Sequence, residues 1–262
     1  MSKLLLLLCV ALIGCSSYTA NTKWNILVVL SGESELILKG NKPFKTGFFL
    51  NELMVPVLQM QKEGIHLTFT TPRGNLPKLD KGSDSASFFA SKEEYAEAKL
   101  VLKKLGLLTN KKSIRSFKQV NEMGLNTFSG VFVPGGHAPM IDLAKSKELG
   151  KILTHFHKEK KPTALVCHGP VALLSAVKKD KSWIYKDYKM TVFSNKEEII
   201  AEKSKLKGKV PFYPEIALKN AGANIQNGKE WQPNIVEHNE LITGQNPSSD
   251  KALIEIFIKK LK

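Results

Sequence analysis

The hydrophobic and polar positions of the chain follow two alternating periods from residue 24 onward. Residues 25–30 form a continuous apolar run that ends at Ser31-Gly32, which is typical of a parallel strand buried on both faces. In residues 47–63 the apolar positions follow roughly helical spacing, with Thr46 as the expected N-cap. Residues 65–71 repeat the strand pattern. This strand–helix–strand unit predicts an α/β fold with a doubly wound, mainly parallel sheet.

A long segment, residues 73–126, interrupts this rhythm before the next strand at 130–133. It is too long for a plain loop, so we predict an inserted cap region that covers the functional site. The alternation resumes with a helix at 146–160, a strand at 163–166, a strand at 189–193 and a closing helix at 249–260. Residues 24–262 are therefore expected to form one α/β domain.

The stretch from Thr163 to Pro170 has the sequence pattern of a nucleophile elbow. A buried strand ends abruptly at Cys167-His168-Gly169, and Pro170 falls in the first turn of an expected helix at 170–177. A thiol at a helix N-terminus and beside a histidine is expected to ionise readily. The alternative is an ordinary buried cysteine at a strand end. The elbow pattern favours Cys167 as a nucleophile.

The first fifteen residues read as a targeting segment. Lys3 precedes the apolar run 4–12, which is too short to span a bilayer, and Ile13-Gly14-Cys15 follows. This run resembles a bacterial lipobox, which implies a signal peptide at 1–14, lipidated Cys15 and a tether at 15–23. The alternatives are a generic signal peptide or a chance apolar N-terminus. The lipobox reading predicts a lipoprotein anchored in the cell envelope, on the periplasmic face, with Cys167 as its single mature thiol.

The chain of 262 residues carries a formal charge of +15, and only Arg73 and Arg115 among its 39 basic residues are arginines. Proteins that bind nucleic acid commonly use arginine forks, so this lysine excess indicates a solvated basic surface rather than a nucleic-acid site. Attraction to an anionic membrane fits the composition better.

Two further patterns are candidates for chemistry. Gly135 and Gly136 follow the strand 130–133, where open backbone N–H groups can bind an oxyanion. Glu197 and Glu198 follow Ser194 in a first helical turn, where stabilisation of the helix dipole is the simpler explanation. The spacing of His66, His155, His157 and His238 does not predict a metal site.

Taken together, four ordered motifs resemble the PfpI superfamily, relatives of the class I glutamine amidotransferases, and within it the branch of heat-shock chaperones and glyoxalase III enzymes. The motifs are Thr-Gly-(x)4-Glu at 46–52, Pro-Gly-Gly-His at 134–137, Val-Cys-His-Gly-Pro at 166–170 and Thr-Gly-Gln-Asn-Pro at 243–247. The resemblance implies a flavodoxin-like sandwich with a cap.

The resemblance also implies a catalytic set. Cys167 matches the family nucleophile, His168 its neighbouring histidine, and Glu52 the glutamate that hydrogen-bonds the thiol. Glu198 matches the acid that orients the histidine, with Glu197 as the competing candidate. Backbone N–H groups of Gly135, Gly136 and His168 would hold the oxyanion.

The implied activity is glyoxalase III chemistry without cofactor or metal. Cys167 would add to the aldehyde of methylglyoxal or another small 2-oxoaldehyde and release a hydroxy acid such as D-lactate. A holdase chaperone or a redox sensor that uses Cys167 without turnover is one alternative. An amidase, peptidase or protein deglycase with the same elbow is another. The sequence leaves the substrate and a homodimer open.

Overall fold

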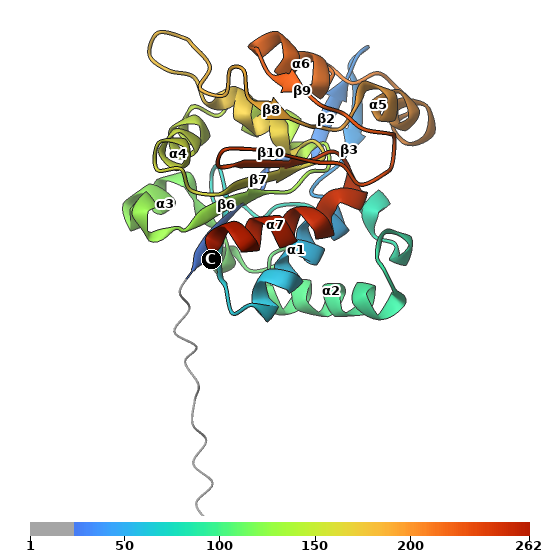
Figure 1. Ribbon diagram of the computed structural model, residues 1–262. Helices are drawn as coiled ribbons and strands as arrows, with labels where there is room; N and C mark the ends of the chain where they lie inside the picture. Colours follow the sequence, from blue (N-terminus) through green and yellow to red (C-terminus); the bar gives the residue numbers. More distant parts are fainter. Residues whose placement is uncertain (1–23) are drawn as a thin grey trace, which may run out of the picture.

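The computed structural model describes residues 24–262, which form a sheet with helices on both faces (Figure 1). The predicted signal peptide and the lipidation at Cys15 lie outside the described residues. None of the helices in the described part of the chain combines the length and apolarity needed to cross a membrane.

The central sheet has seven strands in the order β10-β11-β7-β6-β1-β4-β5, and only β10 runs antiparallel to its neighbour. This confirms the predicted flavodoxin-like, mainly parallel sheet. The strands are β1 Asn25–Val29, β4 His66–Thr71, β5 Arg115–Ser116, β6 Gly130–Val133, β7 Thr163–Val166, β10 Ile235–His238 and β11 Leu241–Gly244.

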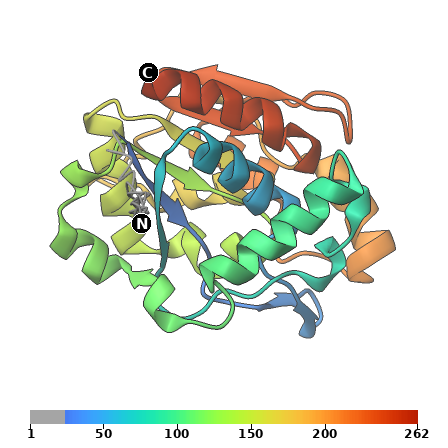
Figure 2. The same ribbon diagram turned by 90° about the horizontal axis from the view of Figure 1, so that it is seen from below.

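The two faces of β1 show why its apolar run is continuous. Ile26 and Val28 pack into one core with the helices α1 Leu50–Lys62, α2 Lys92–Leu105 and α7 Asp250–Leu261. Leu27 and Val29 pack into a second core with α3 Phe117–Met123 and α4 Lys147–Lys158. Figure 2 shows α1, α2 and α7 side by side on the same face of the sheet. Burial on both faces requires apolar residues at every position of the strand.

The remaining elements lie around the carboxyl ends of the strands or at the periphery. They are the hairpin β2 Glu35–Leu38 and β3 Lys42–Lys45, the parallel pair β8 Lys189–Met190 and β9 Asn224–Ile225, and the helices α5 Asn195–Ala201 and α6 Pro214–Ala221. The strand expected at 189–193 is therefore only two residues long, and it pairs outside the central sheet.

Two local predictions about helices are wrong. Thr46 does not cap α1: Phe49 is the N-cap residue, and Ser83 Oγ accepts a hydrogen bond from Leu50 N–H at 2.9 Å. Phe48 instead pairs with Leu79 in an isolated β-bridge, and Phe49 has an extended backbone. The helix expected at 170–177 is a 3₁₀ helix, Gly169–Ser175.

The segment 73–126 joins the fold closely. Its strand β5 extends the sheet edge beside β4, and its helix α2 packs on α1. The loop before α2 reaches the carboxyl ends of the central strands. That this segment is an inserted cap region stays a prediction.

Candidate active site

Cys167 occupies a strained turn directly after the central strand β7. Its φ of 59° lies in the left-handed region, which is rare for residues other than glycine and costs about 1–3 kcal/mol. Two backbone hydrogen bonds fix this turn: Cys167 N–H donates to Gly244 O, and Phe193 N–H donates to Cys167 O, both at 2.9 Å. The elbow geometry predicted from the sequence is present, with the sulfur at the carboxyl end of the sheet.

A hydrogen-bonded chain leads away from the sulfur. Cys167 Sγ lies 3.2 Å from His168 Nδ1, and His168 Nε2 lies 2.8 Å from Glu198 Oε2. The other carboxylate oxygen of Glu198 lies 3.0 Å from His137 Nε2. All four residues are buried. An ionised Glu198 can accept hydrogen bonds from the Nε2–H groups of both histidines. Nδ1 of His168 then carries no proton, and its lone pair faces the thiol.

Glu198, rather than Glu197, is the acid that contacts His168. Glu197 forms a capping box with Ser194 and accepts hydrogen bonds from Gln245 and Asn246 Nδ2. Both side chains are buried, so stabilisation of the helix dipole at an exposed helix end does not explain them. Glu197 therefore fixes the loop around α5, and Glu198 is directed into the site.

Glu52 lies on the other side of the sulfur. A Cβ built on Gly135 would come within 2.6 Å of Glu52 Oε2 and 2.7 Å of Cys167 Cβ, so these groups converge around the glycine. Glu52 is completely buried. Within the described residues neither of its oxygens has a hydrogen-bond partner of ordinary geometry, although Cys167 and the backbone of Gly135 lie close enough to oppose the rise in its pKa that burial causes.

Burial sets the protonation states of this cluster. It raises the pKa of Glu52 to about 8, so the carboxyl is protonated at neutral pH. Burial, followed by the electrostatic influence of His137, lowers the pKa of His168 to about 4 and keeps its imidazole neutral. Burial raises the pKa of Glu198, but the contacts with His168 and His137 outweigh it and hold that pKa below its ordinary value.

The expectation that the Cys167 thiol ionises readily is wrong. Burial raises the pKa of Cys167 well above its ordinary value, and Glu52 raises it further, while the backbone of Gly136 lowers it only in part. The short 3₁₀ helix does not offset this burial. The resting nucleophile is therefore a thiol whose proton must pass to His168 when the sulfur attacks.

The Gly-Gly turn brings backbone N–H groups to the sulfur. Gly136 has a φ of 79°, and a Cβ there would collide with the carbonyl of Gly47. A Cβ on Gly135 would lie 2.8 Å from His168 N. Gly135, Gly136 and His168 thus lie together as predicted, and their role as an oxyanion site stays a prediction.

A cavity of about 370 Å³ opens above Cys167. Its walls are mainly apolar, and they include two residues of the segment 73–126, Gly82 and Phe88. The lining residues are Phe49, Gly82, Phe88, Gly136, His137, Cys167, His168, Phe193, Ala201, Ser204, Lys205, Trp231, Pro247 and Ser248. The space suits a small organic molecule held against the sulfur.

His137 lies in the site, although the sequence motifs assign no role to it. It follows β6, the parallel neighbour of β7, so a residue just after β6 must lie close to one just after β7. Together His137, His168 and Glu198 place three possible metal-ligand atoms within 4.8 Å of one another. Their separations of 2.8 Å and 3.0 Å fit hydrogen bonds that fill the space between them.

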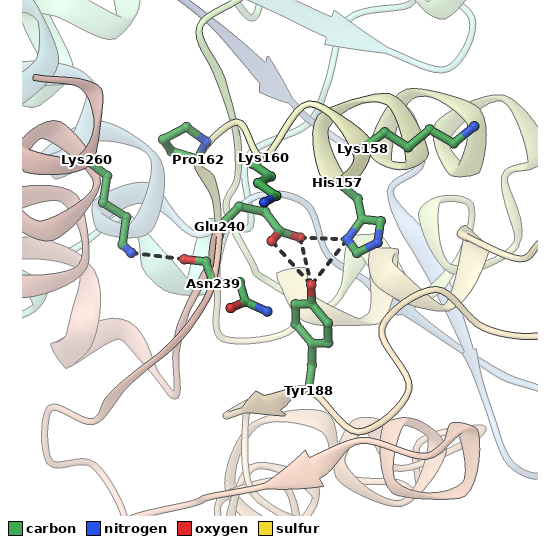
Figure 3. A pocket seen from close by; sticks show the side chains of 8 residues that line it. All are labelled: His157, Lys158, Lys160, Pro162, Tyr188, Asn239, Glu240 and Lys260. Atoms are coloured by element: carbon green, nitrogen blue, oxygen red, sulfur yellow. Dashed lines mark hydrogen bonds and ion pairs between the residues drawn. The ribbon is translucent and has the colours of Figure 1, made fainter.

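A second cavity, of about 640 Å³, lies at the opposite end of β7, beside Pro162 (Figure 3). Glu240 accepts a hydrogen bond from Tyr188 and lies 2.8 Å from His157 Nδ1 (Figure 3). Its lining includes lysines but no cysteine or serine. This cluster joins the C-terminal end of α4 to the start of β11. It lies near the amino end of β7, whereas Cys167 follows the carboxyl end of that strand.

The chain is similar to known proteins along most of its length. A family model described as ThiJ/PfpI family-like matches residues 44–213. The chain is 25% identical over 243 residues to the protein/nucleic acid deglycase HchA of Pseudomonas aeruginosa, covering 90% of this chain and 80% of that protein. The corresponding Staphylococcus aureus deglycase is 26% identical, with 91% and 80% covered.

Solved structures show the same fold. Glyoxalase III from Candida albicans superposes with a TM-score of 0.74 at 21% identity, covering 91% of this chain and 98% of that one. The rapid encystment protein of Francisella tularensis superposes with a TM-score of 0.77 at 24% identity, with 91% and 99% covered.

Proposed function

The chain belongs to the ThiJ/PfpI family, and we propose that it is a glyoxalase III-like enzyme that converts methylglyoxal and related 2-oxoaldehydes to hydroxy acids through Cys167. One observation carries the proposal. A buried carboxyl with a pKa of about 8 lies on one side of the thiol, and a neutral histidine lies on the other. Thioester chemistry needs only the histidine, whereas moving a proton between two carbons needs a second acid–base group with a pKa near neutrality.

The first step forms a bond between Cys167 Sγ and the aldehyde carbon C1. The thiol proton passes to His168 Nδ1, and Glu198 stabilises the imidazolium through Nε2–H. The aldehyde oxygen becomes an alkoxide near the N–H of Gly136 and takes the proton of Glu52. The product is a neutral hemithioacetal beside a Glu52 carboxylate.

The second step moves the proton. Glu52 removes the hydrogen of C1, and the C2 oxygen takes the proton of His168, which gives an enediol. Glu52 then delivers its proton to C2, and His168 takes the proton of the C1 hydroxyl. These transfers leave a lactoyl thioester on Cys167. A carbon bonded to the sulfur is within reach of both groups because they flank that atom.

Hydrolysis restores the starting state. Water adds to C1, one of its protons passes to Glu52, and the departing sulfur takes the proton of His168. Lactic acid leaves, while Glu52, His168 and Cys167 regain the protonation states in which they began.

The proposal is tested by assaying the purified chain with methylglyoxal, glyoxal and amide substrates beside Cys167→Ala. We expect acid formation from both 2-oxoaldehydes by the unmodified chain and none above background by the variant. Hydrolysis of the amides without acid formation from methylglyoxal would overturn the proposal in favour of an amidase. In the same assay with a methylglyoxal-glycated peptide, release of the free amine with no acid formation from the free 2-oxoaldehydes would favour the deglycase activity in the names of the curated relatives.

A further inference from the structure

Lys205 lies in the wall of the cavity above Cys167, although the proposed reaction does not use it. It comes from the π-helix Glu202–Leu206, which continues α5, the helix that carries Glu198. Of the described lining residues it is the one lysine, and no arginine or carboxylate lines the cavity with it. Its side chain is half-buried, so the ammonium group lies where the apolar wall of the cavity meets solvent.

The ammonium group of Lys205 is held in place from several sides. It lies 2.8 Å from Asp80 Oδ2 and 5.1 Å from the centre of the Phe49 ring. Asp80 is itself buried and accepts a hydrogen bond from Gly82 N–H at 2.9 Å. A Cβ on Gly82 would come within 2.9 Å of Lys205 Cε, so the absence of a side chain there leaves room for the lysine.

The ammonium group retains donors for a ligand. It has three N–H donors, and within residues 24–262 Asp80 is the side chain that accepts a hydrogen bond from it. Its positive charge also reaches the reacting groups: it opposes the burial that raises the pKa of Glu52, and it adds to the burial that lowers the pKa of His168. The ammonium group therefore lines the cavity with N–H donors that its hydrogen bond to Asp80 does not use.

We propose that Lys205 is a specificity-determining residue that binds a carboxylate on the substrate, so that the preferred substrates are 2-oxoaldehydes with a carboxylate at the far end of a short carbon chain. This rests on the proposed function for the aldehyde end of the molecule. The carbonyl is at Cys167, the chain lies along the apolar wall formed by Phe49 and Phe88, and the anionic end meets Lys205.

Alkylation of Cys167 tests the charge preference independently of turnover. Iodoacetate and iodoacetamide have nearly the same shape but differ by one charge, and in both cases the sulfur displaces iodide. The rates are measured on the full chain by mass spectrometry of the peptide that contains Cys167, which separates it from Cys9 and Cys15. The ratio of the two rates cancels changes in thiol reactivity.

We expect Lys205→Met to lower the iodoacetate-to-iodoacetamide ratio about tenfold, the size of one lost charge interaction of moderate strength. Lys205→Arg should keep most of the ratio. Lys209→Met is the matched control: Lys209 lies 2.8 Å from Glu202 but does not line the cavity, and its loss should leave the ratio unchanged. In the double variant Asp80→Asn/Lys205→Met no acid is left without its partner, and the ratio should again be low.

An unchanged ratio in Lys205→Met and the double variant would overturn the proposal, as would an equal fall in Lys209→Met, which would assign the preference to general basic charge. Turnover gives the second test. We expect 4,5-dioxopentanoate to have a lower KM than methylglyoxal, and Lys205→Met to remove that difference. If neither compound is turned over, the proposed function fails, while the alkylation ratio still decides the role of Lys205.

Discussion

Glu52→Gln is expected to lower the turnover of methylglyoxal by about 10²–10⁴-fold, the usual contribution of one proton-transfer catalyst. Glutamine keeps the volume of the side chain and a hydrogen-bond donor beside Cys167, but it cannot give up and regain a proton. The thiol should therefore still react with iodoacetamide. The measurement is kcat for acid formation together with the alkylation rate of Cys167 in the same preparation.

The pH dependence of kcat/KM provides the control for this prediction. His168 must be neutral to accept the thiol proton, so activity should fall as pH drops below about 4, where the imidazole becomes protonated. Glu52 must be protonated at rest, so activity should fall as pH rises above about 8. Any residual activity of Glu52→Gln should lack this fall above about pH 8, the upper limb of the pH profile. Equal turnover in the two proteins, with the upper limb retained, would show that Glu52 is a structural residue.

Glu198→Gln should reduce turnover on the order of 10³-fold, as expected when the group that fixes a catalytic histidine tautomer is lost. The carboxylate accepts from Nε2–H of both His137 and His168, at 3.0 Å and 2.8 Å. An amide has only one oxygen, so its NH₂ group must face one of the two rings. If that ring is His168, the ring proton moves to Nδ1 and the thiol loses its base.

Glu197→Gln is the matched variant, because Glu197 is the neighbouring buried acid and its carboxylate accepts hydrogen bonds from Ser194 and Asn246. It should affect thermal stability more than kcat. The two variants are compared by kcat and by their unfolding midpoints. A greater loss of kcat in Glu197→Gln than in Glu198→Gln would contradict the assigned roles.

The sequence predicts the parts of the site that depend on neighbouring residues. The apolar run of β7, the abrupt turn at Cys167 and the adjacent His168 are all local, and the structure shows the elbow that they predict. The sequence pattern alone could not decide whether Glu198 or Glu197 contacts His168. The choice depends on which face of α5 points to the sheet, and the hydrogen bonds of Glu197 with Gln245 and Asn246 fix that face.

Other features depend on burial and on contacts between distant segments. The resting thiol could not be predicted, because its pKa depends on enclosure by Glu52 from α1 and by the turn after β6. Nothing in the sequence distinguishes Lys205 from the other lysines, because its place in the cavity wall depends on the π-helix. The place of His137, by contrast, could have been inferred, because the carboxyl ends of adjacent parallel strands lie side by side.

The most direct test of the account is the covalent state of Cys167 during turnover. The full chain is mixed with methylglyoxal, quenched in acid and digested, and the adducts are located by mass spectrometry. We predict a lactoyl thioester on the Cys167 peptide that appears and decays with substrate, and no acid formation by Cys167→Ala. Steady acid formation with an unmodified Cys167, or undiminished turnover by Cys167→Ala with adducts on lysines alone, would contradict the account.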